Sequence, residues 1–168
     1  MERTLIAMRH AKSAWPLGVP DEKRPLSARG RRDAVVAGQL LSSRLPRPDE
    51  VIVSPARRAR QTVKLFQSML GPVLTRRDDR VYAASWWEIL DVIHEVDDDV
   101  ETLMLVGHNP GLEDLVRQLT GHGRERAVRQ LAHKYPTSAI AVLVADLPWS
   151  RWGAGCAELT NLLIPRAG

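Results

Sequence analysis

Basic side chains follow a short apolar run closely at three places in the sequence. They are the pair Arg9 and His10, the pair Arg57 and Arg58, and His108. Arginine presents a planar fork of donors that suits phosphate oxygens, and it stays charged at any working pH. Histidine can act as a nucleophile or carry a proton near neutral pH. If the three places converge in the fold, these residue types indicate a phosphoryl site rather than a metal site.

The hydrophobic pattern shows which elements would bring these side chains together. Strands are predicted at 4–8, 50–53, 73–75, 102–106, 137–145 and 157–164, and helices at 27–44, 55–71, 86–95 and 111–119. Strands that alternate with helices predict a mostly parallel sheet with helices on both faces, a three-layer α/β/α fold. Ligands of such sheets bind beyond the carboxyl ends of the strands, so we expect the basic loops to meet there.

Length and composition indicate one globular domain over residues 1–168. A content of 44% hydrophobic and 26% charged residues is ordinary for a folded chain. The single cysteine, Cys156, excludes an internal disulfide, and the longest apolar run, 139–145, is too short to cross a membrane. We therefore expect a cytoplasmic protein that does not bind a membrane.

The net charge of +4 predicts an anionic partner. The arginine-rich stretches 29–32 and 57–60 lie in helical segments, where a charge run is usually a solvated face. Aromatic residues are not interleaved with the basic ones as in single-strand binders, which disfavours nucleic acid. No spacing typical of metal ligands occurs, and the acidic run 97–99 is typical of a turn. We expect a phosphorylated substrate and no metal.

Four segments resemble, in order, the motifs of the histidine phosphatase superfamily, whose fold is phosphoglycerate mutase-like. They are MRHAKSAW at 8–15, RPLSARG at 24–30, VSPARRARQT at 53–62 and VGHNPGLEDL at 106–115. The RHAKS form, the RPL segment and YPTSAIAVL at 135–143 are similar to its SixA-type phosphohistidine phosphatase branch. The resemblance covers about residues 4–145, and four motifs in this order make it specific.

The resemblance implies a covalent mechanism. His10 is the nucleophile that takes the phosphoryl group, and water then hydrolyses the phosphohistidine. Arg9, Arg58 and His108 form the phosphate pocket, and the motif spacing selects Arg58 rather than Arg57. The two arginines supply the charge neutralisation that phosphoryl transfer needs, so neither a metal nor another cofactor is implied. Because His10 must be neutral to attack, we expect its ring to donate one N–H to a backbone carbonyl.

Further site residues follow from the same motifs. Ser13 occupies the Ser/Thr position of the first motif, and Lys12 and the backbone N–H of Asn109 are additional phosphate-binding candidates. The general acid of family members that act on phosphate esters resembles Asp79, in DRVYA at 79–83. Pro16 stands where mutase-type members carry an asparagine, which disfavours a mutase.

Three functions remain open from the sequence. The first is a phosphohistidine phosphatase acting on a phosphorylated protein, because a phosphoimidazole leaves without a strong general acid and a chain of this length leaves the site open. The second is a small-metabolite phosphomonoesterase or mutase with the same core. The third is a non-catalytic basic module that binds nucleic acid or protein.

Overall fold

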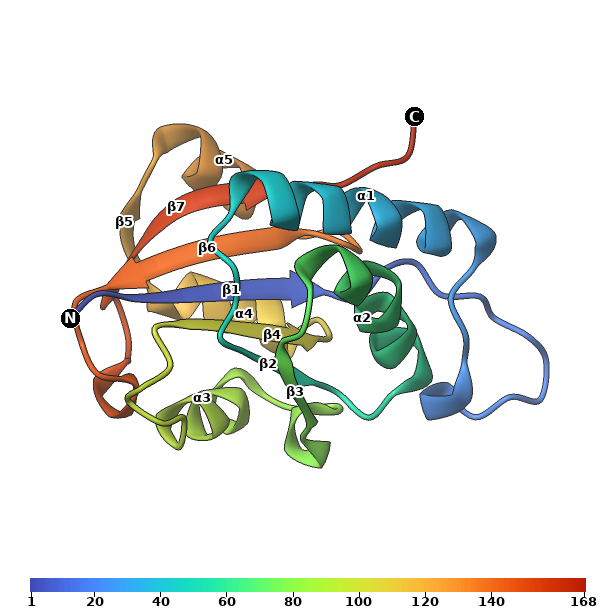
Figure 1. Cartoon of the computed structure of the whole chain (residues 1–168), viewed down its shortest axis with the longest axis horizontal. Coiled ribbons are helices and arrows are strands. Elements are labelled where there is room, and N and C mark those ends of the chain that lie inside the picture. The colour runs from blue at the N-terminus through green and yellow to red at the C-terminus, as the bar shows by residue number, and fades with distance from the viewer.

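The computed structural model describes residues 1–168 as seven strands and five α-helices (Figure 1). The strands are β1 (Arg3–Arg9), β2 (Glu50–Val53), β3 (Leu74–Arg77), β4 (Thr102–Gly107), β5 (Thr120–Gly123), β6 (Ile140–Ala145) and β7 (Ala157–Leu163). The helices are α1 (Ala28–Arg44), α2 (Arg57–Leu70), α3 (Trp86–His94), α4 (Gly111–Leu119) and α5 (Glu125–His133). Short 3₁₀ turns lie at Asp21–Lys23, Asp79–Val81 and Trp149–Arg151. None of the helices combines the length and apolar character that crossing a membrane requires.

All seven strands belong to one sheet in the order β3-β2-β4-β1-β6-β7-β5. The strands β1, β2, β3 and β4 pair with one another in parallel, and β5 pairs in parallel with β7. Only β6 runs against the rest, because it is antiparallel to both β1 and β7. The predicted mostly parallel sheet is confirmed, and β1 lies at its centre between β4 and β6.

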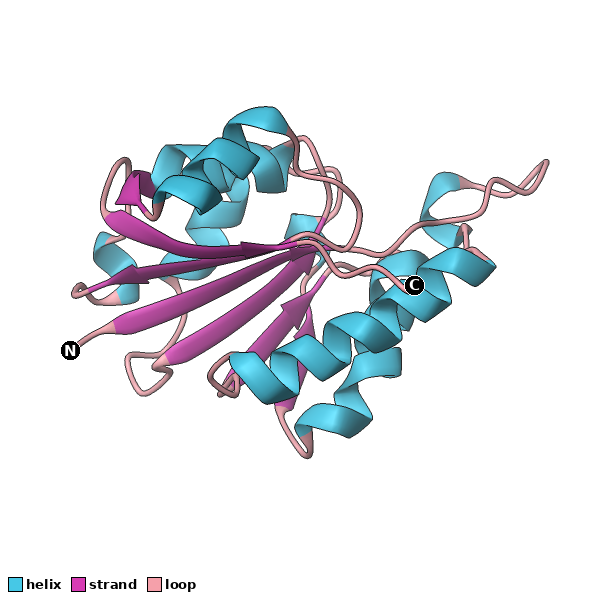
Figure 2. Cartoon of the chain, turned by 90° about the horizontal axis from the view of Figure 1, so that it is seen from above, coloured by secondary structure: helices cyan, strands magenta, loops and turns pink.

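Helices cover both faces of the sheet (Figure 2). Successive side chains of a strand point to opposite faces, and in β1 Leu5 and Ala7 pack on one side while Ile6 and Met8 pack on the other. The first side joins a core with α3, α4 and α5, and the second joins a core with α1 and α2. The three-layer architecture is confirmed, and burial on both faces explains why the inner strands β1, β2, β4 and β6 are continuous apolar runs.

Helix α1 begins where the sequence predicts it and packs against the chain that follows β1. Its N-cap Ser27 accepts a hydrogen bond from the backbone N–H of Gly30 at 3.0 Å. The backbone N–H and hydroxyl of Ser27 both donate to the carbonyl oxygen of Lys12, at 2.9 and 3.1 Å. A Cβ at Gly30 would lie 2.0 Å from that same oxygen, so the glycine permits this close approach.

Two elements, β5 and α5, are not predicted from the sequence. Two of the four residues of β5 are glycines, and a Cβ on Gly121 would lie 2.2 Å from the carbonyl oxygen of Gly155. Helix α5 buries only Ala127 and Leu131. Its apolar stripe is therefore too narrow to stand out in a highly charged segment.

Candidate active site

The carboxyl ends of β1, β2 and β4 meet at one edge of the sheet, and the three basic loops converge there. His10 follows β1, His108 follows β4, and Arg58 lies in the first turn of α2, which follows β2. A backbone hydrogen bond ties two of the loops together, because the N–H of His10 donates to the carbonyl of Gly107 at 3.1 Å. The convergence expected from the sequence is confirmed.

Arg58 lies between the two histidine rings, whose centroids are 5.0 Å apart. Its Nε–H donates to Nε2 of His10 at 3.3 Å, and its Nη2 donates to Nδ1 of His108 at 3.3 Å. All three side chains are buried, so the guanidinium is shielded from water and held beside both rings. Arg57 is exposed, which agrees with the motif spacing that selects Arg58.

The hydrogen bonds of His10 define its tautomer. Its Nδ1 lies 2.7 Å from the carbonyl oxygen of Ala11. Since a carbonyl only accepts, Nδ1 carries the proton and donates. Nε2 is then unprotonated, in agreement with its acceptance of the N–H of Arg58. The backbone carbonyl partner expected from the sequence is present, and the lone pair of Nε2 faces the arginine.

His108 is held in the opposite tautomer by Ser54. Its Nδ1 accepts from Arg58, so its Nε2 carries the proton and donates to the Ser54 hydroxyl oxygen at 2.7 Å. Ser54 follows β2 directly and is completely buried. Both imidazoles therefore present an unprotonated nitrogen to one guanidinium.

Burial keeps both imidazoles neutral. Desolvation lowers the pKa of His10 from 6.5 to about 3 and outweighs its hydrogen bond to Ala11, with the nearby His108 and Arg58 as further causes. Desolvation and then the charge of Arg58 lower the pKa of His108 to about 4. A proton on either ring would create a buried charge beside a cation. Near neutral pH, both rings are thus uncharged while the guanidinium between them keeps its charge.

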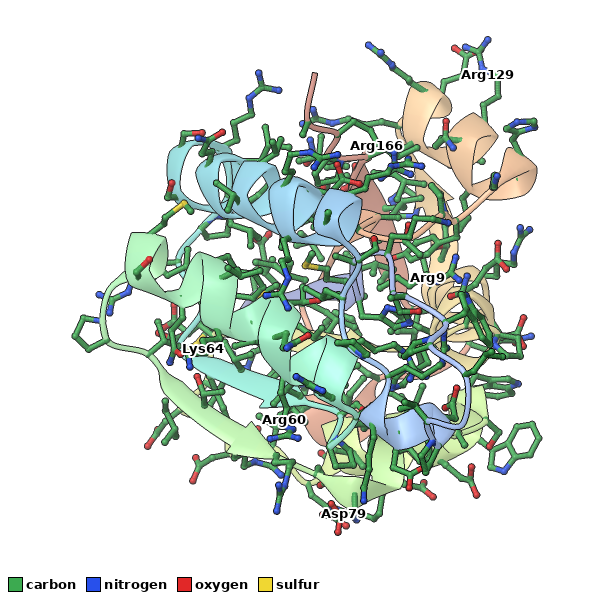
Figure 3. The ribbon with its side chains drawn as sticks, turned by 90° about the vertical axis from the view of Figure 1, so that its right-hand side faces the viewer. Arg9, Arg60, Lys64, Asp79, Arg129 and Arg166 are labelled. Atoms are coloured by element: carbon green, nitrogen blue, oxygen red, sulfur yellow. The ribbon has the colours of Figure 1, made fainter.

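Arg9 and Asn109 are both anchored to the loop that precedes β6. Nη1 of Arg9 and Nδ2 of Asn109 donate to the same carbonyl, that of Tyr135, at 3.2 and 2.9 Å. The Tyr135 hydroxyl is fixed in turn by donating to the carbonyl of Ala7 at 2.6 Å. Nε of Arg9 and Oδ1 of Asn109 are buried without a partner. Figure 3 looks onto this edge of the sheet and labels Arg9.

Asp21 adds to the cluster a carboxylate that no sequence motif indicates. Its carbonyl oxygen accepts from Nη1 of Arg58 at 2.7 Å, and its Oδ2 accepts from Nη2 of Arg58 at 3.1 Å. Oδ2 also accepts from the Tyr82 hydroxyl at 2.6 Å, and Oδ1 accepts from Nε of Arg24 at 3.1 Å. The hydrogen bond from Tyr82, followed by those from Arg58 and Arg24, lowers the pKa of Asp21 to about 2. This carboxylate is therefore ionised near neutral pH.

Ser13 and Lys12 are placed differently with respect to the cluster. Ser13 is buried, and its Oγ accepts from Nη1 of Arg24 at 2.8 Å, which leaves its hydroxyl proton free to donate. Lys12 is exposed, and the contacts it makes are those of its backbone carbonyl with the start of α1. The structure thus connects Ser13 with Asp21 through Arg24.

Asp79 lies apart from these residues. It is exposed, begins the 3₁₀ turn Asp79–Val81, and its carboxylate forms no hydrogen bond or ion pair. Figure 3 shows it at the lower margin of the molecule, directed to solvent and away from Arg9. The structure does not bring Asp79 into the cluster; Tyr82 of the DRVYA segment reaches it instead, and the carboxylate that Tyr82 contacts is Asp21.

The fold and the site together define an α/β protein with a cluster of two arginines and two neutral histidines at the carboxyl edge of a mostly parallel sheet. The structure contains no group of three His, Cys, Asp or Glu side chains that could hold a metal ion. A sequence model described as the histidine phosphatase superfamily (branch 1) matches residues 5–142, a range that contains all four of these residues. The chain belongs to this superfamily.

Particular relatives extend the similarity over nearly the whole chain. An uncharacterised protein of Mycobacterium tuberculosis is 41% identical over 161 residues, which cover 95% of this chain and 100% of the relative. The structure of a candidate phosphohistidine phosphatase SixA from Nakamurella multipartitia is 30% identical, with a TM-score of 0.88 and coverage of 99% and 98% of the two chains. A candidate phosphohistidine phosphatase SixA from Agrobacterium tumefaciens is also 30% identical, with a TM-score of 0.83 and coverage of 97% and 98%.

Proposed function

We propose that residues 1–168 form one catalytic domain that hydrolyses phosphohistidine by transferring its phosphoryl group to His10. The observation that carries this proposal is the state of His10, which is buried and neutral, with Nδ1–H tied to Ala11 and the Nε2 lone pair facing Arg58. An imidazole in this state is a nucleophile at neutral pH without a separate base. The SixA-type structural neighbours support the substrate class.

The proposed reaction has two displacement steps at phosphorus. First, Nε2 of His10 attacks, and the bond between phosphorus and the ring nitrogen of the substrate breaks. The electron pair of that bond stays on the leaving imidazole, which is neutral if its other nitrogen carries a proton. A water oxygen then attacks phosphorus, the bond to Nε2 breaks, and the lone pair returns to His10. Both protons of the water leave with the phosphate.

The other pocket residues bind and neutralise the phosphoryl oxygens in this proposal. Arg9 and Arg58 match the charge of the phosphoryl dianion, and phosphoryl transfer depends mainly on such neutralisation and on positioning. Both Nη atoms of Arg58 donate to Asp21. Phosphate binding therefore exchanges these contacts for phosphoryl oxygens. His108 lies on the other side of Arg58 and completes the pocket.

Three further residues have weaker proposed roles at the phosphate. Ser13 can donate its hydroxyl proton to a phosphoryl oxygen, because its Oγ already accepts from Arg24. Asn109 contributes its backbone N–H, because its side-chain amide is engaged by the carbonyl of Tyr135. Lys12 is exposed, so its ammonium group contributes attraction at the mouth of the pocket.

The absence of a protonated carboxyl group from the cluster favours cleavage of a P–N bond. An alkoxide is a poor leaving group, so ester hydrolysis calls for a positioned general acid. Asp21 has a pKa of about 2 and is ionised at neutral pH, and Asp79 is exposed and makes no contact with the cluster. A phosphoimidazole can leave as a neutral ring, so this pocket suits it better than an ester.

The open surroundings of the pocket favour a phosphoryl group carried by a protein. Between the end of β3 and the start of β4, the chain forms one 3₁₀ turn and α3 and no capping subdomain. Small metabolites usually bind in deeper, mostly enclosed pockets. A histidine side chain on the surface of a folded partner can instead reach an open site.

Labelled substrate tests this proposal. A protein that carries labelled phosphohistidine is mixed with the enzyme and quenched in base, and we expect acid-labile label on His10. The variant His10→Ala should lose nearly all activity. The substrate class follows from kcat/KM for phosphohistidine compared with phosphoserine, phosphotyrosine and sugar phosphates. A clear preference for a sugar phosphate would support the metabolite phosphatase or mutase, and no hydrolysis of any of these substrates would support the non-catalytic module.

Metal independence is tested separately. Arg9 and Arg58 provide two positive charges beside His10, which is the contribution that a metal ion makes in other phosphoryl-transfer sites. Activity should therefore survive exhaustive chelation. Loss of activity on chelation, with recovery on addition of a divalent ion, would contradict this part of the proposal.

A further inference from the structure

A loop projects from the carboxyl edge of the sheet and exposes two large apolar side chains. We call residues 14–20, which run from the end of the first motif to the 3₁₀ turn Asp21–Lys23, the apolar finger. Trp15 is 78% exposed and Leu17 is 101% exposed. Figure 1 shows the loop as the blue segment that extends beyond the arrowhead of β1, at the right of the molecule. Single exposed apolar residues are ordinary. A tryptophan and a fully exposed leucine two residues apart form an exposed apolar surface, which is typical of an interaction site.

The base of the apolar finger is fixed. The backbone N–H of Ala14 donates to the carbonyl of Pro25 at 2.9 Å, and Ser13 pairs with Leu26 in an antiparallel bridge. Arg24 is only 7% exposed, donates to the carbonyl of Ala14 at 3.2 Å, and stacks its guanidinium 3.4 Å from the centroid of the Trp15 ring. The indole is thus held in position although most of its surface faces solvent.

The backbone of the apolar finger is also restricted. Pro16 and Pro20 fix φ on both sides of the exposed leucine. Gly18 adopts a φ of +73°, which a residue with a side chain rarely adopts, and so permits the turn after Leu17. A side chain presented by a preorganised backbone loses little conformational entropy on binding. These properties are those of a binding element rather than of a disordered loop.

The apolar finger is linked to the catalytic cluster through Arg24 and Asp21. Arg24, which stacks on Trp15, donates to both Ser13 and Asp21. Asp21 in turn accepts from Arg58, which contacts His10. A molecule that covers the apolar finger therefore also reaches the mouth of the pocket.

We propose that the apolar finger docks onto an apolar patch of a folded protein substrate, next to the phosphohistidine that the pocket receives. This inference rests on the proposed function and adds the surface that recognises the partner. Tryptophan is enriched among the residues that dominate binding energy in protein interfaces, and such residues gather near the centre of the contact. Leu17 is free of contacts within the chain, so a partner can bury it completely.

An exposed basic face of α2 lies beside the site and favours a partner with acidic side chains. Arg57, Arg60 and Lys64 are exposed on one face of α2, form no ion pair, and line a depression of about 250 Å³ together with Gln61. Figure 3, which looks onto the carboxyl edge, shows Arg60 and Lys64 on α2. The apolar patch of the partner is therefore bordered by acidic side chains, because such borders match this basic face.

Two matched probes and one small substrate test the docking role. Each probe is the same stable helical bundle with acidic residues around a single surface histidine, which is phosphorylated with phosphoramidate. One probe carries exposed leucines beside the histidine, and the other carries serines at those positions. Free phosphohistidine is the small substrate, which fills the pocket without reaching the apolar finger. We measure kcat/KM for the wild type and for Leu17→Ser on all three.

The wild type should prefer the leucine probe over the serine probe by about tenfold in kcat/KM, since the burial of one leucine accounts for such a factor. Leu17→Ser should abolish this preference and leave the rate on free phosphohistidine unchanged. The matched control is Leu74→Ser, which removes a leucine that is 66% exposed at the start of β3 and should retain the preference.

Equal rates of the wild type on the two probes, or a loss on free phosphohistidine in Leu17→Ser, would overturn the docking role alone. If the wild type does not hydrolyse free phosphohistidine or either probe, the proposed function fails and the docking role fails with it.

Discussion

The contact between α1 and the chain after β1 predicts that Gly30→Ala damages both stability and the proposed active site. The added Cβ would lie 2.0 Å from the carbonyl oxygen of Lys12 and about 3 Å from its carbon and nitrogen. These are backbone atoms, so they cannot rotate away as a flexible side chain would. Either the start of α1 or the segment around Lys12 must move.

The magnitude follows from two opposing effects. Forcing extra atoms into a packed contact costs about 1–3 kcal/mol, and a backbone obstacle at this distance belongs at the upper end. Replacing glycine by alanine inside a helix recovers about 1 kcal/mol. The net expectation is a loss of about 2 kcal/mol in the free energy of unfolding. Movement at Lys12 also displaces Ala11, whose carbonyl holds Nδ1 of His10. A misplacement of about 1 Å can cost a factor of about 100 in rate.

Urea unfolding and kcat/KM on free phosphohistidine measure the two effects. The control is Gly153→Ala, because a Cβ at that position meets no atom within 4 Å. We expect the control to match the wild type in both measurements. If Gly30→Ala also unfolds at the wild-type urea concentration and keeps full activity, the close approach of α1 does not position His10 and the reasoning is refuted.

Three other outcomes follow from the site. Ser54→Ala removes the acceptor of the Nε2–H of His108, so urea unfolding should show a free energy of unfolding lower by about 1–3 kcal/mol. Steady-state kinetics should show a lower kcat, and an unchanged kcat would show that the tautomer of His108 is unimportant. Folding holds the pKa of His10 at about 3, against 6.5 for an unperturbed histidine, so the unfolded chain binds more protons than the folded chain between these two pH values. The free energy of unfolding should therefore fall as the pH drops through that window, by up to about 1.4 kcal/mol per pH unit. In urea unfolding from pH 7 to pH 4, the free energy of unfolding should depend less on pH for His10→Asn than for the exposed-residue control His122→Asn, and equal dependence would contradict the burial argument. Arg58→Lys keeps a positive charge but loses the planar guanidinium that contacts His10, His108 and Asp21 together. We therefore expect kcat/KM in the phosphatase assay to fall at least a hundredfold. Near-normal activity would show that Arg58 acts only through its charge.

The sequence predicts those parts of the fold and site that depend on local pattern. Ser27 is recognisable as an N-cap because capping requires a hydroxyl at one position only, and the structure shows the expected hydrogen bond to the N–H of Gly30. The choice of Arg58 over Arg57 depends on motif spacing, and the structure buries the first and exposes the second. Strand ends with basic residues predicted the convergence because parallel strands end at one edge of a sheet.

The parts that the sequence does not reveal depend on long-range contacts. Asp21 begins a 3₁₀ turn of only three residues, which is too short to show periodicity, and its importance arises only when Tyr82, sixty-one positions later, donates to it. The DRVYA segment suggests its own aspartate as a site residue. In the structure, the 3₁₀ turn exposes Asp79 and directs the Tyr82 side chain toward the cluster. Helix α5 is not predicted from the sequence because only Ala127 and Leu131 of its nine residues are buried.

The strand order determines when during synthesis the pocket can form. Strand β1 is synthesised before the other six strands of the sheet and lies between β4 and β6, so its partners are residues 102–107 and 140–145. His10 is held from both of these sides, because its N–H donates to the carbonyl of Gly107 and its carbonyl accepts from the N–H of Ser138. A nascent chain that ends before β6 therefore contains the nucleophile, both arginines and His108. It lacks β6, the strand that pairs with β1 on the side opposite β4. Contacts of such long range form late in folding, and a truncated translation product is accordingly expected to be inert rather than a partially active hydrolase.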